Sequence, residues 1–183
     1  MVVIKSDDAE IEAAFTAACL MVASARTAPK AHGIDKITAA IVMGEDKEKL
    51  ANKIAEMPDL PLPKERLLKN VMNIKNADAV VLIGVKMGDE KDEQRRIMRL
   101  VDLGIAIGSA VKTASILNID NRIMFTAGKA AQNLKLVDGD VIFGIPISVR
   151  GSNIFFDRYD PLKASWQEKL PSRELKRARL IEV

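Results

Sequence analysis

Residues 26–30 read Arg-Thr-Ala-Pro-Lys and place two cations and a hydroxyl within one turn of the chain. An arginine binds phosphate through its planar, forked guanidinium, and a lysine binds it as a point charge. Arg26, Thr27 and Lys30 therefore suit a ligand that carries a phosphate group. The same residues also suit the end of a helix, where the helix dipole stabilises cations. Spacing alone leaves both interpretations open.

Two further polar segments follow apolar stretches of the chain. Residues 120–122 read Asp-Asn-Arg, and residues 148–153 read Ser-Val-Arg-Gly-Ser-Asn. Arg150 followed by Gly151 suits an anion, because glycine lets the backbone approach a ligand closely. Each segment alone is more typical of a turn. They form a site only if the fold brings Arg122, Arg150 and Gly151 close to residues 26–30.

The scarcity of cysteine and histidine excludes several classes of site. The chain has one cysteine, Cys19, and one histidine, His32. One cysteine cannot form a disulfide within the chain, and it cannot supply the thiolates of a zinc or iron–sulfur centre. Residues 104–108 lack the third glycine of a dinucleotide-binding fingerprint, and the sequence contains no P-loop. We therefore predict no metal ligands and no catalytic side chain.

Hydrophobic periodicity and turn residues predict a chain of mixed helices and strands. A first helix begins at Ser6 or Asp7 and ends before Pro29, because proline disfavours helical geometry in the residue that precedes it. The remaining predicted helices are 46–57, 64–75, 93–117 and 126–136, and the predicted strands are 37–43, 79–86, 141–149 and, at the end, 153–156.

The predicted helix at residues 93–117 is rich in small residues. Gly104, Ala106 and Gly108 lie in its apolar second half. Glycine in a helix interior is destabilising by roughly 0.5–1 kcal/mol relative to alanine, so a compensating contact is expected. We infer that a second helix, or the same helix of a partner subunit, crosses here. Asp102 and Lys112 are expected to form structural pairs, because buried charges are usually paired.

The net charge of +3 comes from the last part of the chain, since residues 158–183 hold seven Lys and Arg against four Asp and Glu. The composition argues against binding of single-stranded nucleic acid, because aromatic residues make up only 4% of the chain and stacking on bases needs them. The N-terminus lacks the pattern of a signal peptide, and no segment is apolar enough to span a membrane. We expect a single, soluble, cytoplasmic domain.

Two stretches resemble FMN-dependent nitroreductases. Residues 18–43 resemble the start of these enzymes, where a helix ends in an arginine-rich turn that grips the flavin phosphate. Residues 102–148 resemble their central segment. The closer resemblance is to prokaryotic proteins described as containing a ferredoxin domain, and it rests on residues 25–30, 103–115, 120–124 and 153–158. Relatives in this group carry several cysteines after the second strand, whereas residues 87–99 here contain none.

The resemblance implies an α+β, nitroreductase-like fold, with a central, mostly antiparallel sheet flanked by helices and a long buried Gly/Ala-rich helix. It implies a domain of residues 1–157, a C-terminal arm of residues 158–183 that packs on a partner subunit, and a homodimer that binds FMN without an iron–sulfur cluster. The residues expected to hold the flavin or another small anionic ligand are Arg26, Thr27, Lys30, Arg122, Arg150 and Gly151.

Two functions remain open at this point. The first is a nitroreductase-like FMN-binding protein that acts as an oxidoreductase on an unknown substrate. The second is a non-catalytic dimeric binding or scaffold protein that has lost the iron–sulfur cluster and perhaps the flavin.

Overall fold

The computed structural model describes residues 3–57, 62–88 and 91–156. The helices are α1 (Ser6–Thr27), the 3₁₀ turn η1 (Ala31–Gly33), α2 (Gly44–Glu56), α3 (Lys64–Asn76), α4 (Glu93–Ile116) and α5 (Phe125–Asn133). The strands are β1 (Ile37–Val42), β2 (Ala79–Val85), β3 (Asp120–Asn121) and β4 (Val141–Ser148). The predicted arm, residues 158–183, lies outside the described residues.

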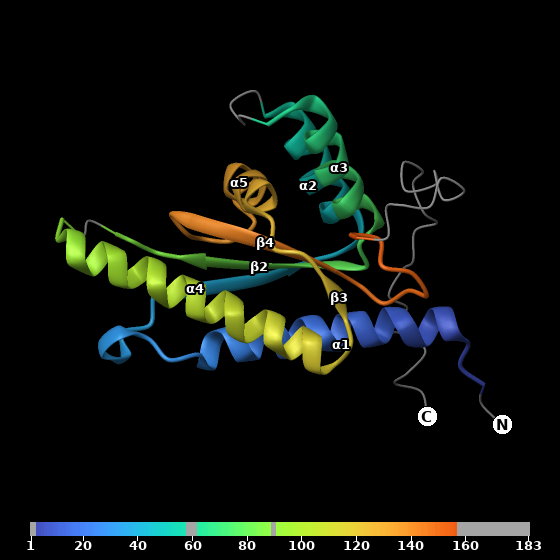
Figure 1. Ribbon diagram of the computed structural model, residues 1–183, viewed down its shortest axis with the longest axis horizontal. Coiled ribbons are helices and arrows are strands. Elements are labelled where there is room, and N and C mark those ends of the chain that lie inside the picture. Colours follow the sequence, from blue (N-terminus) through green and yellow to red (C-terminus); the bar gives the residue numbers. More distant parts are fainter. Residues whose placement is uncertain (1–2, 58–61, 89–90, 157–183) are drawn as a thin grey trace.

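The strands form one sheet in the order β1-β2-β4-β3, and every neighbouring pair is antiparallel. Helices α1 and α4 lie on one face of this sheet, and α2, α3 and α5 lie on the other (Figure 1). The prediction of a central antiparallel sheet flanked by helices is therefore confirmed.

Strand β2 explains why the molecule has two separate cores. All seven of its residues are buried, and the side chains of a strand point alternately to its two faces. Val81 and Ile83 belong to the core under α1 and α4, whereas Val80 and Leu82 belong to the core under the other three helices. The continuous apolar sequence of β2, in which polar and apolar residues do not alternate, is thus explained by helices that cover both faces of the sheet.

The small residues of α4 divide between its two faces. Ala106, Ala110 and Ala114 are fully buried in the core that α4 shares with α1. The helix that packs on this alanine face is α1, which does not account for the contact predicted at the glycines. Gly104 and Gly108 point the other way, and a Cβ atom added to either would meet nothing within 4 Å. Only one face of helix α4 is therefore buried within the single chain.

Local details differ from the predictions at a few places. The segment at Asn153 forms a turn rather than a strand, because its side-chain Oδ1 accepts hydrogen bonds from the amides of Phe155 and Phe156 at 3.0 and 3.1 Å. Helix α1 has no side-chain cap, and the Ser6 hydroxyl donates to Glu10 instead. No helix in residues 3–57, 62–88 and 91–156 is long and apolar enough to cross a membrane.

Candidate functional site

Arg26 lies in the last turn of α1 and is paired with Asp35, which comes just before β1. Its Nη1 atom donates to Asp35 Oδ1 at 3.3 Å, and Nη2 contacts the second carboxylate oxygen. Partial burial raises the pKa of Asp35, but the hydrogen bond from the Ile37 amide and the Arg26 guanidinium outweigh it and hold this pKa below its ordinary value. The pair links the end of α1 to the start of β1.

The other two polar residues of this turn interact with the backbone of α1. The Thr27 hydroxyl donates to the carbonyl of Ala23 at 3.0 Å. The Lys30 ammonium donates to the carbonyl of Ala28 at 2.8 Å and also contacts the carbonyl of Arg26. The Arg26 carbonyl is one of the groups that a helix C-terminus leaves without an intrahelical partner, so Lys30 is used as the helix-end interpretation describes. The Thr27 hydroxyl bonds back to a carbonyl one turn earlier in the same helix.

A hollow of about 600 Å³ adjoins Arg26 along the exposed edge of β1. Lys36 and Lys86 also line it, so three cations surround the space together with Asp35. The two lysines lie side by side because Lys36 precedes β1, Lys86 follows its antiparallel neighbour β2, and the Lys86 amide donates to the Lys36 carbonyl at 2.9 Å. The sequence analysis did not identify Lys36 or Lys86 as site residues. Their positions at the ends of two predicted strands could have indicated them.

The loop after α1 is anchored on α4 through a buried carboxylate. Asp102 is 3% exposed, and its Oδ1 accepts a hydrogen bond from the Ala31 amide at 2.8 Å. Arg99 lies 3.4 Å from Asp102 Oδ2 and donates to the carbonyl of Ile34 at 3.2 Å. The predicted structural pairing of Asp102 is confirmed, whereas Lys112 is exposed.

The two later polar segments meet at the opposite end of the sheet. Asp120 of β3 is paired with Ser148 of β4 and accepts a hydrogen bond from Asn153 at 2.9 Å. Arg150 pairs at 3.2 Å with Asp78, a buried carboxylate that also accepts from the Val149 amide. Asp78 was not predicted as part of the site, although it directly precedes a fully buried strand.

The fold therefore brings together only part of the predicted site. Arg26 lies beside the residues where β1 begins and β2 ends, whereas Arg150 and Gly151 follow β4 at the end where β2 begins. Strand β2 has seven residues, and at roughly 3.3 Å per residue it separates the two groups by about 20 Å. One flavin phosphate cannot contact both groups within a single chain.

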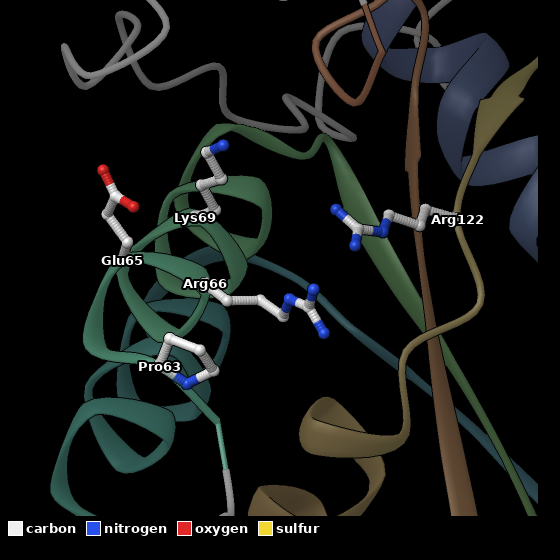
Figure 2. Close-up of a pocket in the computed structure, with 5 residues that line it drawn as sticks. All are labelled: Pro63, Glu65, Arg66, Lys69 and Arg122. Atoms are coloured by element: carbon white, nitrogen blue, oxygen red, sulfur yellow. The ribbon is translucent and has the colours of Figure 1, made fainter.

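Arg122 lies in a different hollow. Its side chain and those of Arg66 and Lys69 from α3 line a pocket of about 460 Å³ (Figure 2). This pocket is on the face of the sheet that α2, α3 and α5 cover, away from α1. The sequence analysis placed Arg66 and Lys69 only within the predicted helix at residues 64–75.

The described residues contain no group of three or more His, Cys, Asp or Glu side chains that could hold a metal ion. The only cysteine of the chain, Cys19, is exposed on α1. Iron–sulfur clusters are held by several thiolates, commonly four. The residues present therefore do not fit such a cluster.

Several solved structures with a similar fold are described as nitroreductases. A nitroreductase family protein from Clostridium novyi NT superposes with a TM-score of 0.53 and 14% identity, covering 81% of this chain and 77% of that one. A putative nitroreductase from Desulfovibrio desulfuricans, solved in complex with FMN, gives a TM-score of 0.55 and 11% identity, with 75% of each chain covered. At these identities the likeness shows the fold alone.

Sequence comparison shows the family. Residues 95–158 match the model of a family described as "uncharacterized protein containing a ferredoxin domain (DUF2148)". A protein from Archaeoglobus fulgidus is 36% identical, in an alignment that covers 78% of this chain and 90% of the relative. A likeness of this extent, joined to the family match, means that the chain belongs to the family of proteins containing a ferredoxin domain, built on a nitroreductase-like fold.

Proposed function

We propose that the protein is a homodimer that binds FMN and acts as an oxidoreductase, with the second subunit packed on the outer face of α4. The observation that carries the proposal is the apolar outer face of α4, in a fold whose solved representatives include an FMN complex.

The outer face of α4 has the composition of an interface. The exposed apolar residues are Ile97, Met98, Leu100, Val101, Ile105 and Ile116 of the helix and Leu117 just after it, each between 39% and 70% exposed. Exposed apolar side chains that gather on one element are typical of interaction sites on soluble proteins. Gly104 and Gly108 lie among these residues with open space before them, so another helix can approach the backbone closely. A second copy of α4 offers the matching surface, as twofold dimers require.

The hollow beside Arg26 supplies the phosphate-binding chemistry that FMN requires. Arg26, Lys36 and Lys86 provide three cations, and apolar side chains including Val22 and Ile37 line the rest of the wall. Its volume of about 600 Å³ lies in the range of small-molecule sites, about 300–1,000 Å³. Bound FMN would supply the hydride chemistry, and the protein would bind and orient it. Thr27 and Lys30 are held on the backbone of α1 and would contribute by keeping this helix end rigid.

The non-catalytic alternative is favoured by a different observation. Arg26 is already paired with Asp35, and Arg150 with Asp78. A ligand phosphate must compete with the first carboxylate for Arg26. A dimer that keeps the fold and binds partners without flavin would need no such competition.

Absorbance, FMN titration and sedimentation of the purified protein test the proposal together. We expect a dimer that is yellow or that takes up FMN. Arg26→Gln should weaken FMN binding about tenfold or more, because hydrogen bonds to charged groups contribute about 1.5–3 kcal/mol. Lys49→Gln is the control, since Lys49 also forms an exposed ion pair, with Asp46 on α2, outside the hollow. A colourless dimer that binds no FMN would support the alternative, and a monomer without FMN would contradict both.

A further inference from the structure

The pocket around Arg122 concentrates positive charge from two separate elements. Arg66 and Lys69 come from α3, and Arg122 comes from the segment that follows β3. The side chains of Arg66 and Arg122 extend into the same gap from opposite sides, whereas the Glu65 carboxylate points away from it (Figure 2). A phosphate between the two side chains would accept hydrogen bonds from both guanidinium groups.

The start of α3 adds to the positive potential of this pocket. Pro63 precedes the helix, provides no side-chain cap and forms part of the pocket wall. The partial positive charge of a helix dipole lies at this end, where anions are stabilised. Helix α3 has 13 residues, long enough for the effect to count.

Two buried amide groups on the same helix lack partners for some of their polar atoms. Asn70 and Asn73 are each 6% exposed. Within the described part of the chain, Asn70 Oδ1 and Asn73 Nδ2 have no hydrogen-bond partner. Neither amide lines the pocket, but each lies one turn along α3 from a pocket cation, since Asn70 follows Arg66 by four residues and Asn73 follows Lys69 by four. Buried polar atoms of this kind are normally satisfied by protein, water or ligand.

Asn70 also ties together the elements that form the pocket. Its Nδ2 atom donates to the Thr126 hydroxyl at 3.2 Å, which connects α3 to the first turn of α5. Arg122 lies four residues before Thr126, and its amide donates to the carbonyl of Pro146 in β4 at 3.2 Å. The two sides of the pocket are therefore held by contacts to a helix and to the sheet.

We infer that this pocket binds the phosphate group of a small molecule. Guanidinium groups match phosphate oxygens with paired hydrogen bonds, and three cations suit a doubly charged group. The volume of about 460 Å³ leaves room for a small organic portion beside the phosphate. The inference does not depend on flavin binding at Arg26, because that hollow involves α1 and the β1 edge, on the other side of the sheet.

Inorganic phosphate, ADP and FMN, each titrated into the ¹⁵N-labelled full chain, provide the test. We expect phosphate to shift the amide signals of residues 64–73 and of Arg122, and to leave residues 26–38 unchanged. Arg66→Gln should weaken phosphate binding about tenfold or more. Lys64→Gln is the matched control, because Lys64 is an exposed cation of the same helix that does not line the pocket.

The ligands separate the possible sources of the phosphate. If Arg66→Gln weakens ADP and inorganic phosphate but not FMN, the pocket is a site for a phosphorylated compound other than the flavin. If it weakens FMN equally, the flavin phosphate itself occupies the pocket. No binding of phosphate or ADP at millimolar concentration would overturn the inference, and so would equal losses in the Arg66→Gln and Lys64→Gln variants. Failure of the wild-type protein to bind FMN or to dimerise bears only on the proposed function.

Discussion

Replacing both outward glycines of α4 by alanine should have opposite effects on the fold and on the dimer. A Cβ atom at Gly104 or Gly108 meets nothing within 4 Å in the chain. Alanine in a helix interior is more stable than glycine by roughly 0.5–1 kcal/mol. The Gly104→Ala/Gly108→Ala variant should therefore gain about 1–2 kcal/mol in the unfolding free energy of the single chain. If a second α4 packs on this face, the added methyl groups push the helices apart.

The expected loss in dimerisation follows from the cost of overpacking, typically about 1–3 kcal/mol in a well-packed contact. That range corresponds to a dissociation constant raised about fivefold to more than a hundredfold. Sedimentation across a concentration series measures this constant. Urea denaturation, performed at concentrations where the chain is monomeric, measures the unfolding free energy separately, since dimerisation would otherwise add to apparent stability.

Gly128 on α5 gives the contrasting result for the same substitution. A Cβ atom there would lie 1.7 Å from the carbonyl oxygen of Ile142 and 2.8 Å from the Cα of Phe143. Neither is a flexible side chain, so Gly128→Ala should destabilise the chain by about 3 kcal/mol or more.

A Gly104→Ala/Gly108→Ala variant that becomes more stable and still dimerises with the wild-type dissociation constant would refute the placement of a partner on Gly104 and Gly108.

Two further predictions concern the loop between α1 and β1. Asp102→Ala should destabilise the chain by about 3–5 kcal/mol in urea denaturation, because it leaves the buried Arg99 charge without its carboxylate and the Ala31 amide without its acceptor. Asp102→Asn should cost less, because it keeps an acceptor for the amide. Folding lowers the pKa of Asp35, so its pairing with Arg26 stabilises the fold at pH values above the ordinary pKa of an aspartate. This stabilisation, about 1 kcal/mol or less for an exposed pair, is lost as the pH falls through the folded-state pKa. In the Asp35→Asn variant, that loss should be absent from the acid side of the curve of unfolding free energy against pH.

Most elements of the fold could be predicted because their signals are local. Pro29 ends α1 two residues after Thr27, and the uninterrupted apolar run of β2 marks a strand covered on both faces. The bounds of α3 and α4 agree with the predicted bounds to within one residue. Residues 153–156 were wrongly predicted as a strand, because the Asn153 side chain satisfies the backbone locally and favours a turn.

The candidate site was harder to predict, because it depends on which strands are neighbours and on their direction. The polar turns at Arg26 and Arg150 look equivalent in sequence, yet the antiparallel order of the sheet places them at opposite ends of β2. Arg66 and Lys69 resemble a solvated helix face until the segment carrying Arg122 packs opposite them. Sequence spacing carries no information about contacts of this kind, which arise between elements far apart in the chain.

The separation of the two polar turns gives the dimer proposal a geometric consequence. The loop that carries Asp35 lies beside the first half of α4, since Arg99 donates to the carbonyl of Ile34, whereas the turn after β4 lies beyond the end of α4, where Asn153 bonds to Asp120. Gly104 lies midway along this helix. A twofold axis near Gly104 and perpendicular to α4 would pair the helices antiparallel. The first half of one α4 then lies over the second half of the other, and the end of the molecule that holds Arg26 approaches the end of the second copy that holds Arg150. A parallel crossing would bring like ends together, so a ligand contacting both turns requires the antiparallel arrangement.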